Sequence, residues 1–519
     1  MTRSEMLDRA TERREPWDIV VIGGGATGVG VAVDAAARGY SVLLLEQHDF
    51  GKGTSSRSTK LVHGGVRYLE RGNIGLVMEA LKERGRLLHN APHLVRDLAF
   101  VVPAYAWWER PFYGLGLKLY NLLSGRYRLC TTKSLSKEDT IRHLPTIRRE
   151  GLRGGVLYHD GQFDDARLLI NLAATAAERG AVLLNYAPVV AVDRGASGRV
   201  IGVTAHDVET GREFQAAAKV VVNATGAFCD GVRRMADPNA TPMVAPSQGV
   251  HLVFDRSFLP GETALMVPHT PDKRVMFAIP WHGHTLVGTT DVEMQDASLE
   301  PRASDAEIDF ILETAGRYLS KSPTRADVLS VFAGVRPLVK VAGTRTAALP
   351  RDHTIHVDAD GLVTITGGKW TTYRQMAEDG VNHAAKLGGL QARPCPTRSL
   401  RIHGWQDHGD NSDTLASYGS DAAGVRDLMR ENAALRATLH PALPYCEAEV
   451  VWAARREMAR TVEDVLARRT RSLFLNAKAA IAAAPRVAEI LSGELGRDGA
   501  WRDEQVREFA SVARGYCIT

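Results

Sequence analysis

The chain has 519 residues, of which 45% are apolar, 24% are charged and 7% are aromatic. This composition is typical of a globular protein, and the length predicts two or three folding units rather than one core. The 64 basic residues exceed the 60 acidic ones by only four and are interleaved with them, which excludes a general polyanion binder, so we expect no nucleic-acid partner.

The glycine and cysteine content excludes further classes of protein. The 48 glycines form neither the repeat of collagen nor a flexible linker, so we expect them in tight turns and at close backbone approaches. The five cysteines are scattered and lack CxxC spacing, which predicts neither a disulfide framework nor a metal site. The charged first 16 residues and the lack of a long apolar run predict neither a signal peptide nor a membrane span, and indicate a cytoplasmic protein.

The first predicted elements form a βαβ unit. Residues 17–22 have the pattern of a buried strand, residues 26–39 have helical composition, and residues 41–45 form a second apolar strand. A right-handed crossover would place the two strands parallel and side by side.

The turn of this unit carries the spacing GxGxxG at Gly23, Gly25 and Gly28. The first glycine permits the tight turn, the second lets the backbone approach a pyrophosphate, and the third allows close helix packing. Glu46 ends the second strand, where a carboxylate accepts hydrogen bonds from ribose hydroxyls. The unit therefore predicts a dinucleotide site.

Later segments repeat the pattern of a strand followed by a glycine turn. Residues 220–222 precede NATG at 223–226, and residues 362–365 precede TGGK at 366–369. A simple NAD-binding domain is complete within about 150 residues. Cofactor elements spread as far as residue 367 therefore favour a longer cofactor, FAD, over NAD.

Residues 101–133 combine positive charge with aromatic side chains. The segment contains five basic residues, one acidic residue and seven aromatic ones, and Leu115, Leu119, Leu122 and Leu123 share one helical face. This pattern suits a helix lying in the headgroup region of a membrane. It suits equally a helix in the core of the second folding unit.

The C-terminal part has helical spacing and is rich in alanine, arginine, glutamate and leucine. Residues 447–471 contain six basic and five acidic residues, which predicts a solvated helix with internal ion pairs. A partner or homodimer contact is the alternative for this segment.

The composition along the chain predicts an oxidoreductase domain at 1–393 and a helical cap domain at 394–519. Within the first domain we expect cofactor-binding elements at about 16–97, 162–240 and 350–393, and an antiparallel β substrate domain at about 98–161 and 241–349.

Several motifs together resemble the FAD-dependent glycerol-3-phosphate dehydrogenase family. They are VIGGGATGVGVAVDAAARG at 21–39, TSSRSTKLVHGGVRYLE at 54–70, APHL at 91–94, DDARL at 164–168, VVNATG at 221–226, IPWHGHTLVGTTDVE at 279–293, GVRPL at 334–338 and GGKWTTYR at 367–374. The resemblance implies an α/β fold: a Rossmann-like FAD-binding domain of the glutathione-reductase and D-amino-acid-oxidase type, with an inserted antiparallel β substrate domain and a helical C-terminal domain.

The resemblance also implies a reaction. It is the oxidation of sn-glycerol 3-phosphate to dihydroxyacetone phosphate at FAD, with electrons passing to ubiquinone or menaquinone at the inner face of the cell membrane. An oxidase that uses oxygen is an alternative, but family oxidases commonly carry an insertion before the C-terminal region that this chain lacks. A membrane-associated FAD-binding redox sensor is a second alternative.

The same resemblance assigns residues to the substrate. It implies that Arg67, Tyr68 and Lys369 bind the phosphate, with Thr289 nearby, and that Arg336 faces the substrate hydroxyls as a catalytic residue. Arginine suits these tasks because its planar fork binds phosphate oxygens and its charge favours a developing alkoxide.

Two histidines are candidates for the base that accepts the hydroxyl proton, because imidazole titrates near neutral pH. His251 ranks ahead of His63 by its place in the family pattern. Gln248 stands where many family members have a basic residue, which changes the charge expected near the site. The hydroxyl-rich run from Thr54 to Thr59 is expected at the FAD, although from composition alone it resembles a solvated loop. The expected cofactor-binding residues are Gly23, Gly24, Gly25, Thr27, Gly28, Glu46, Thr54, Ser55, Ser58, Thr59, Lys60, Gly226, Gly367, Gly368, Lys369 and Thr371.

Overall fold

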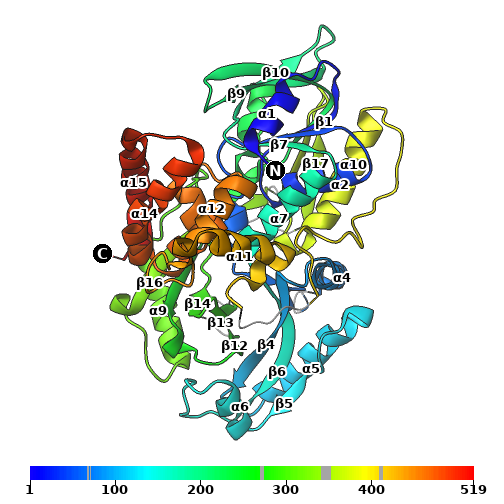
Figure 1. The fold of residues 1–519 in the computed structure, drawn as a ribbon. Helices are drawn as coiled ribbons and strands as arrows, with labels where there is room; N and C mark the ends of the chain where they lie inside the picture. The colour runs from blue at the N-terminus through cyan, green and yellow to red at the C-terminus, as the bar shows by residue number, and fades with distance from the viewer. Residues whose placement is uncertain are drawn as a thin grey trace.

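Two large sheets organise the computed structural model of the chain, which describes residues 1–66, 69, 72–268, 270, 274–340, 352–407 and 413–518. The sheet that contains β1 and β10 occupies the upper half of Figure 1, and the sheet that contains β4 and β6 occupies the lower half. The C-terminal helices α14 and α15 lie along one side. No helix among the described residues is long and apolar enough to cross a bilayer.

The first sheet has the strand order β17-β18-β10-β1-β2-β7, and β9 and β8 extend it as a ribbon from β10. Strand β1 pairs in parallel with both β2 and β10, so the GxGxxG turn lies at the carboxyl edge in the middle of the sheet. The strands are β1 (Trp17–Ile22), β2 (Val42–Leu45), β7 (Val182–Leu184), β8 (Val189–Arg194), β9 (Val200–Asp207), β10 (Arg212–Asn223), β17 (His353–Val357) and β18 (Val363–Gly367).

Both faces of this sheet are covered, which explains why β1 is a continuous apolar run rather than an alternating one. Ile19 and Val21 pack into the core formed with one group of helices, and Val20 and Ile22 pack into the core on the opposite face. The helices are α2 (Ala26–Ala37), α7 (Asp165–Glu178) and α10 (Tyr373–Leu387) on the first face, and α1 (Arg3–Thr11) and α8 (Cys229–Ala236) on the second.

The second sheet has the order β15-β11-β14-β13-β12-β4-β6-β3, with β16 paired to β11 and β5 paired to β6. Its pairs are antiparallel except β12 with β4. The strands are β3 (Leu61–Val62), β4 (Val95–Ala104), β5 (Lys133–Leu135), β6 (Gly154–Phe163), β11 (Val244–Asp255), β12 (Ala264–Val267), β13 (Met276–Trp281), β14 (His284–Gly288), β15 (Val292–Glu293) and β16 (Val328–Val339). The helices α4 (Ile74–Asn90), α5 (Glu109–Leu123), α6 (Lys137–His143) and α9 (Asp305–Tyr318) accompany it.

The C-terminal part consists of α11 (Ala422–Glu431), α12 (Glu447–Arg456), α13 (Ser472–Leu475), α14 (Ala477–Leu495) and α15 (Gly499–Ala513). Phe474 packs against Phe332 of β16 with ring centroids 4.9 Å apart, so these helices share a core with the second sheet. They also bind the first sheet's helices through His403. Its Nδ1 lies 2.5 Å from Glu178 of α7 and its Nε2 lies 2.7 Å from Asp421, and these carboxylates raise the pKa of His403 to about 10.

The expectation of a solvated helix over 447–471 is wrong. Helix α12 ends at Arg456, and Arg468, Arg469 and Arg471 beyond it are buried. Ion pairs within the segment do form, as between Arg468 and Glu463, but its buried arginines also bind acids from distant parts of the chain. Arg468 and Arg469 both bind Asp49, which lies in the loop after β2. The predicted α/β architecture with a β-rich second unit and a helical C-terminal part is confirmed, whereas the domain boundaries stay a prediction.

Candidate active site

A cavity of about 360 Å³ lies at the carboxyl edge of the first sheet. The turns after β1, β2, β10 and β18 border it, and these are the ends at which open α/β sheets bind ligands. The lining includes Gly23, Gly25, Ala26, Thr27, Glu46, Thr54, Ser55, Thr225, Gly226, Pro337, Gly367, Gly368, Lys369 and Trp370. Segments more than 300 residues apart in the sequence therefore form one site.

Two glycines of the GxGxxG turn have no room for a side chain. Gly23 has φ +108°, and a Cβ there would lie 2.8 Å from the carbonyl oxygen of Ala224. A Cβ on Gly28 would lie 1.9 Å from the carbonyl oxygen of Gly23. These contacts let α2 begin directly at the cavity, where the positive end of the helix attracts an anionic group.

Two side chains fix the loops around the cavity. Glu46 accepts the backbone N–H of Gly24 at 2.6 Å and that of His48 at 2.9 Å. Ser55 Oγ accepts the N–H of Ala26 at 2.9 Å and so satisfies one amide at the start of α2. Because carboxylate oxygens have further lone pairs and the glycine turns admit a diphosphate, the residues present fit an FAD.

A second cavity, of about 160 Å³, lies within the second sheet. Its polar lining comprises Thr59, His63, Asp160, Arg274, Thr289, Thr290, Asp291 and Arg336. Arg336 and Pro337 are consecutive in β16, and they line the second and the first cavity respectively. The two cavities are therefore neighbours on either side of one strand.

Two arginines surround Asp291 in this cavity. Arg336 Nη2 donates to Thr289 Oγ1 at 3.2 Å and to the carbonyl of Thr290 at 3.0 Å, and its Nη1 lies 3.4 Å from Asp291 Oδ1. Arg274 Nη1 donates to the carbonyl of Asp291 at 2.7 Å. Two guanidinium groups therefore line this cavity, and the arginine fork suits a small anionic ligand.

Known proteins match the chain over nearly its whole length. A family model described as FAD dependent oxidoreductase matches residues 18–374, and one described as the C-terminal domain of alpha-glycerophosphate oxidase matches residues 365–505. The mitochondrial glycerol-3-phosphate dehydrogenase of Arabidopsis thaliana is 42% identical, over 93% of this chain and 84% of that protein. The human mitochondrial glycerol-3-phosphate dehydrogenase is 41% identical, over 96% of this chain and 74% of that protein. The chain belongs to the FAD-dependent glycerol-3-phosphate dehydrogenase family.

The fold of this family is also found among solved structures. The glycerol-3-phosphate dehydrogenase from Bacillus halodurans, complexed with FAD, superposes with a TM-score of 0.81 at 29% identity and covers 99% of this chain and 98% of its own. The L-alpha-glycerophosphate oxidase from Mycoplasma pneumoniae has a TM-score of 0.56 at 18% identity, over 75% of this chain and 99% of its own, and shows a shared fold. The family and the fold class expected from the motifs are thus confirmed.

Most of the glycerol-3-phosphate dehydrogenase motif residues expected at the cofactor do line the first cavity, and six lie elsewhere. Gly24 binds Glu46 through its N–H, and Gly28 packs α2 against the turn. Thr371 Oγ1 accepts the N–H of His63 at 3.1 Å. Of the other three, Ser58 and Lys60 point toward α7, and Thr59 lines the second cavity instead of the first.

Lys60 forms a fully buried ion pair that the motifs did not predict. Its Nζ lies 2.7 Å from Asp165 Oδ2 and donates to the carbonyl of Ser56 at 2.8 Å. Ser58 Oγ donates to the same Asp165 oxygen at 2.7 Å. Burial lowers the pKa of Lys60 to about 7, and the charge of Asp165 opposes that shift. Asp165, the second acid of DDARL, thus anchors the loop between the two cavities.

His251 lies behind the wall of the second cavity and reaches it through Thr59. Its Nε2 is 2.9 Å from Thr59 Oγ1, and its ring stacks on Phe332 with a centroid distance of 4.9 Å. Burial, helped by the charges of Lys60 and Arg336, lowers the pKa of His251 well below its ordinary value. The imidazole is therefore neutral at pH 7, and Thr59 joins it to the cavity lining.

The side chain of Gln248 points away from the second cavity. Its Nε2 donates to Glu307 at 2.8 Å and to the carbonyl of Arg302 at 3.0 Å, at the start of α9. With glutamine in place of a basic residue at this position, the positive charge is absent from the contact with α9 and not from the cavity wall. His63 lines the cavity as expected, whereas Arg67 and Tyr68 lie outside the described residues.

Proposed function

We propose that this protein oxidises sn-glycerol 3-phosphate to dihydroxyacetone phosphate at FAD and that the electrons then pass to a membrane quinone. The observation that carries the proposal is the position of the arginine-lined cavity, which shares strand β16 with the glycine-lined one. The smaller volume of about 160 Å³ suits a substrate of few atoms. The family membership and the names of the relatives support the same reaction.

The side chains of the smaller cavity divide the work of binding and proton removal. Arg274 and Arg336 supply positive charge for the anionic substrate, and Arg67, Tyr68 and Lys369 are the residues proposed to complete its phosphate site, although Lys369 lines the larger cavity. Bound FAD supplies the two-electron acceptor for the reaction. In the proposed route the proton of the C2 hydroxyl passes to Thr59 Oγ1 while the Thr59 proton passes to His251 Nε2, because Thr59 lines the cavity and contacts His251.

Anaerobic addition of glycerol 3-phosphate to the FAD-loaded protein tests this reaction. We expect loss of the oxidised-flavin absorbance and formation of one dihydroxyacetone phosphate per flavin, with glycerol as the inactive control. Reoxidation is then timed with a quinone analogue and with oxygen. Faster reoxidation by the quinone supports the dehydrogenase, faster reoxidation by oxygen supports an oxidase, and an unchanged flavin spectrum contradicts both.

Helix α5 and the turn before it present an apolar surface that suits attachment to a membrane. Its exposed side chains are Trp107, Trp108, Phe112, Leu115, Leu119 and Leu122, with exposed fractions of 41–79%. Tyr113, Leu117 and Tyr120 are buried on the opposite side of the same helix. The segment thus has both a core face and an exposed apolar face, and Lys118, Arg126, Arg128 and Lys133 beside it are exposed.

This arrangement supports docking on anionic lipid, since apolar area and positive charge together strengthen binding at the headgroup layer. Flotation with anionic liposomes tests it. We expect the FAD-loaded variant W107S/W108S/F112S to lose most of its lipid-bound fraction. The variant V190S/I201S/V208S removes apolar residues of 45–51% exposure from the β8–β9 ribbon and its end, and should float like the parent. Equal flotation of all three proteins would contradict the proposal.

A further inference from the structure

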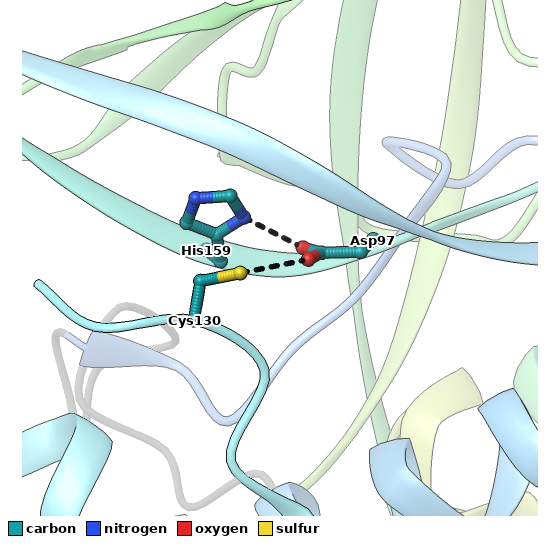
Figure 2. Close-up of side chains that lie close together, drawn as sticks. All are labelled: Asp97, Cys130 and His159. Carbon is teal, nitrogen blue, oxygen red and sulfur yellow. Dashed lines mark hydrogen bonds and ion pairs between the residues drawn. The ribbon is translucent and has the colours of Figure 1, made fainter.

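Three side chains with different ligand atoms meet on the outer face of the second sheet. They are Asp97 of β4, His159 of β6 and Cys130 of the segment that leads from α5 to β5, and Figure 2 shows them pointing toward one another. His159 Nδ1 lies 2.9 Å from Asp97 Oδ1, and Cys130 Sγ lies 3.7 Å from Asp97 Oδ2. One ligand atom from each residue falls within 4.8 Å of the other two.

The sheet itself holds two of these side chains together. Asp97 is opposite Gly161 in the antiparallel β4–β6 pair, and His159 is two residues from Gly161 on the same strand. Residues related in this way lie diagonally on one face of the sheet, within reach of each other's side chains. Asp160, which lies between His159 and Gly161 in β6, points to the opposite face of the sheet and lines the smaller cavity.

The third side chain is brought in by two further contacts. Strand β5 pairs with β6, with Lys133 opposite Leu157, which fixes the chain three residues after Cys130. Asn121 Nδ2 of α5 donates to the carbonyl oxygen of Cys130 at 2.9 Å. The thiol is therefore positioned from both sides by elements of the second sheet and of α5.

The donor set has the chemistry of a zinc ligand group. Sulfur, imidazole nitrogen and carboxylate oxygen are the three ligand types that Zn²⁺ takes in proteins, usually in tetrahedral geometry. With bond lengths of about 2.0–2.3 Å, a tetrahedral zinc separates its ligand atoms by about 3.3–3.5 Å. The 2.9 and 3.7 Å contacts are made to the two different oxygens of Asp97, and one ligand atom from each residue lies within 4.8 Å of the other two, so side-chain rotations would have to bring the three atoms together around the ion.

The site is open to a metal ion from solvent. The Asp97 side chain is 36% exposed, that of His159 is 18% exposed, and Cys130 is exposed. A fourth ligand can therefore be water, as in zinc sites with three protein ligands.

We propose that Asp97, Cys130 and His159 bind one Zn²⁺ ion, which joins the segment after α5 to strands β4 and β6. On binding, the sulfur coordinates as thiolate and its proton leaves to solvent. The ion cross-links two strands to the segment between α5 and β5, so it strengthens the attachment of α5 to the sheet. The proposal does not depend on the identity of the substrate.

Titration of the metal-free, FAD-loaded full chain with Zn²⁺ and with Co²⁺ tests the site. We expect one tight Zn²⁺ per chain, a rise in Tm on binding, and slower proteolysis within 105–133. The Co²⁺ form should show a thiolate-to-metal charge-transfer band. C130S and H159N should each weaken Zn²⁺ binding roughly tenfold or more, because losing even a residue that only orients a metal ligand costs about that much affinity. C130S should also lose the charge-transfer band while keeping its flavin content and basal activity.

Two control variants separate this site from adventitious binding. H356N alters an exposed pair of histidine and aspartate, His356 and Asp358, that are 3.1 Å apart and include no cysteine. C517S alters a half-buried cysteine that is not one of the three proposed ligands. Both should bind zinc like the parent. Equal Zn²⁺ affinity in C130S and the parent, or a Co²⁺ form of the parent without the thiolate band, would overturn the proposal.

Discussion

Replacing Thr59 by valine removes the hydroxyl that joins the smaller cavity to His251 while keeping the shape of the side chain. The Thr59 Oγ1 to His251 Nε2 distance is 2.9 Å, and the histidine is 2% exposed. Nδ1 of His251 has no hydrogen-bond partner among the described residues. The valine variant therefore leaves a buried imidazole with neither ring nitrogen bonded to the protein.

Two magnitudes follow from this geometry. Loss of the only hydrogen bond to a buried polar group costs about 1–3 kcal/mol of unfolding free energy. If proton removal passes through Thr59, the rate of flavin reduction by glycerol 3-phosphate should fall by about 10²–10⁴-fold, the usual contribution of a positioned base. The substrate's arginine contacts are untouched, so KM should change far less than kcat.

Stopped-flow flavin reduction under anaerobic conditions measures the effect, and T59S is the matched control because it keeps the hydroxyl. We expect T59S to reduce flavin within a fewfold of the parent rate. Since Thr59 and His251 act in series, T59V/H251N should be no slower than the slower single variant. A T59V enzyme that reduces flavin at the parent rate, or single effects that multiply in the double variant, would refute this route for the proton.

Three further predictions rest on buried charge. Asp165→Asn leaves Lys60 buried without its counter-ion and should lower the unfolding free energy by about 3–5 kcal/mol in denaturant titration. The control Asp327→Asn, at the surface, should lower it by less than about 1 kcal/mol. Equal losses in the two variants would contradict the assigned ion pair. The raised pKa of His403 contributes stability that is complete below pH 6.5 and is lost as pH rises toward about 10; Tm measured over this range should fall, and His403→Gln should flatten the fall. Arg274→Leu should raise KM for glycerol 3-phosphate at least tenfold with unchanged flavin content, and an unchanged KM would remove this residue from the substrate site.

The cofactor elements could be predicted because their constraints are local. The spacing of Gly23, Gly25 and Gly28 depends on one turn, and the structure shows the crowding that requires glycine there. The hydroxyl-rich run was only partly predictable. Thr54 and Ser55 line the larger cavity, but Ser58 turns toward Asp165, because the path of the loop decides which side each hydroxyl faces.

Residues whose roles come from strand pairing were missed for a physical reason. Arg274 is the last of three consecutive charged residues, 272–274, before β13, and only the folded sheet brings it to Asp291. The cysteine spacing that excluded a metal motif likewise tests only neighbours along the chain. Asp97 and His159 are brought together by the register of β4 and β6, which no spacing rule detects.

Helix α5 links the exposed apolar surface to the substrate cavity without exposing the cavity. Tyr120, on its buried face, accepts the N–H of Gly64 at 2.7 Å and donates to Asp160 at 2.6 Å. Gly64 follows His63, and both His63 and Asp160 line the smaller cavity. We therefore expect serine substitutions on the exposed face to reduce lipid attachment and to leave flavin reduction intact, because the buried face separates them from the cavity. A change at Tyr120 would disturb the cavity wall itself, so the two faces of one helix can be tested independently.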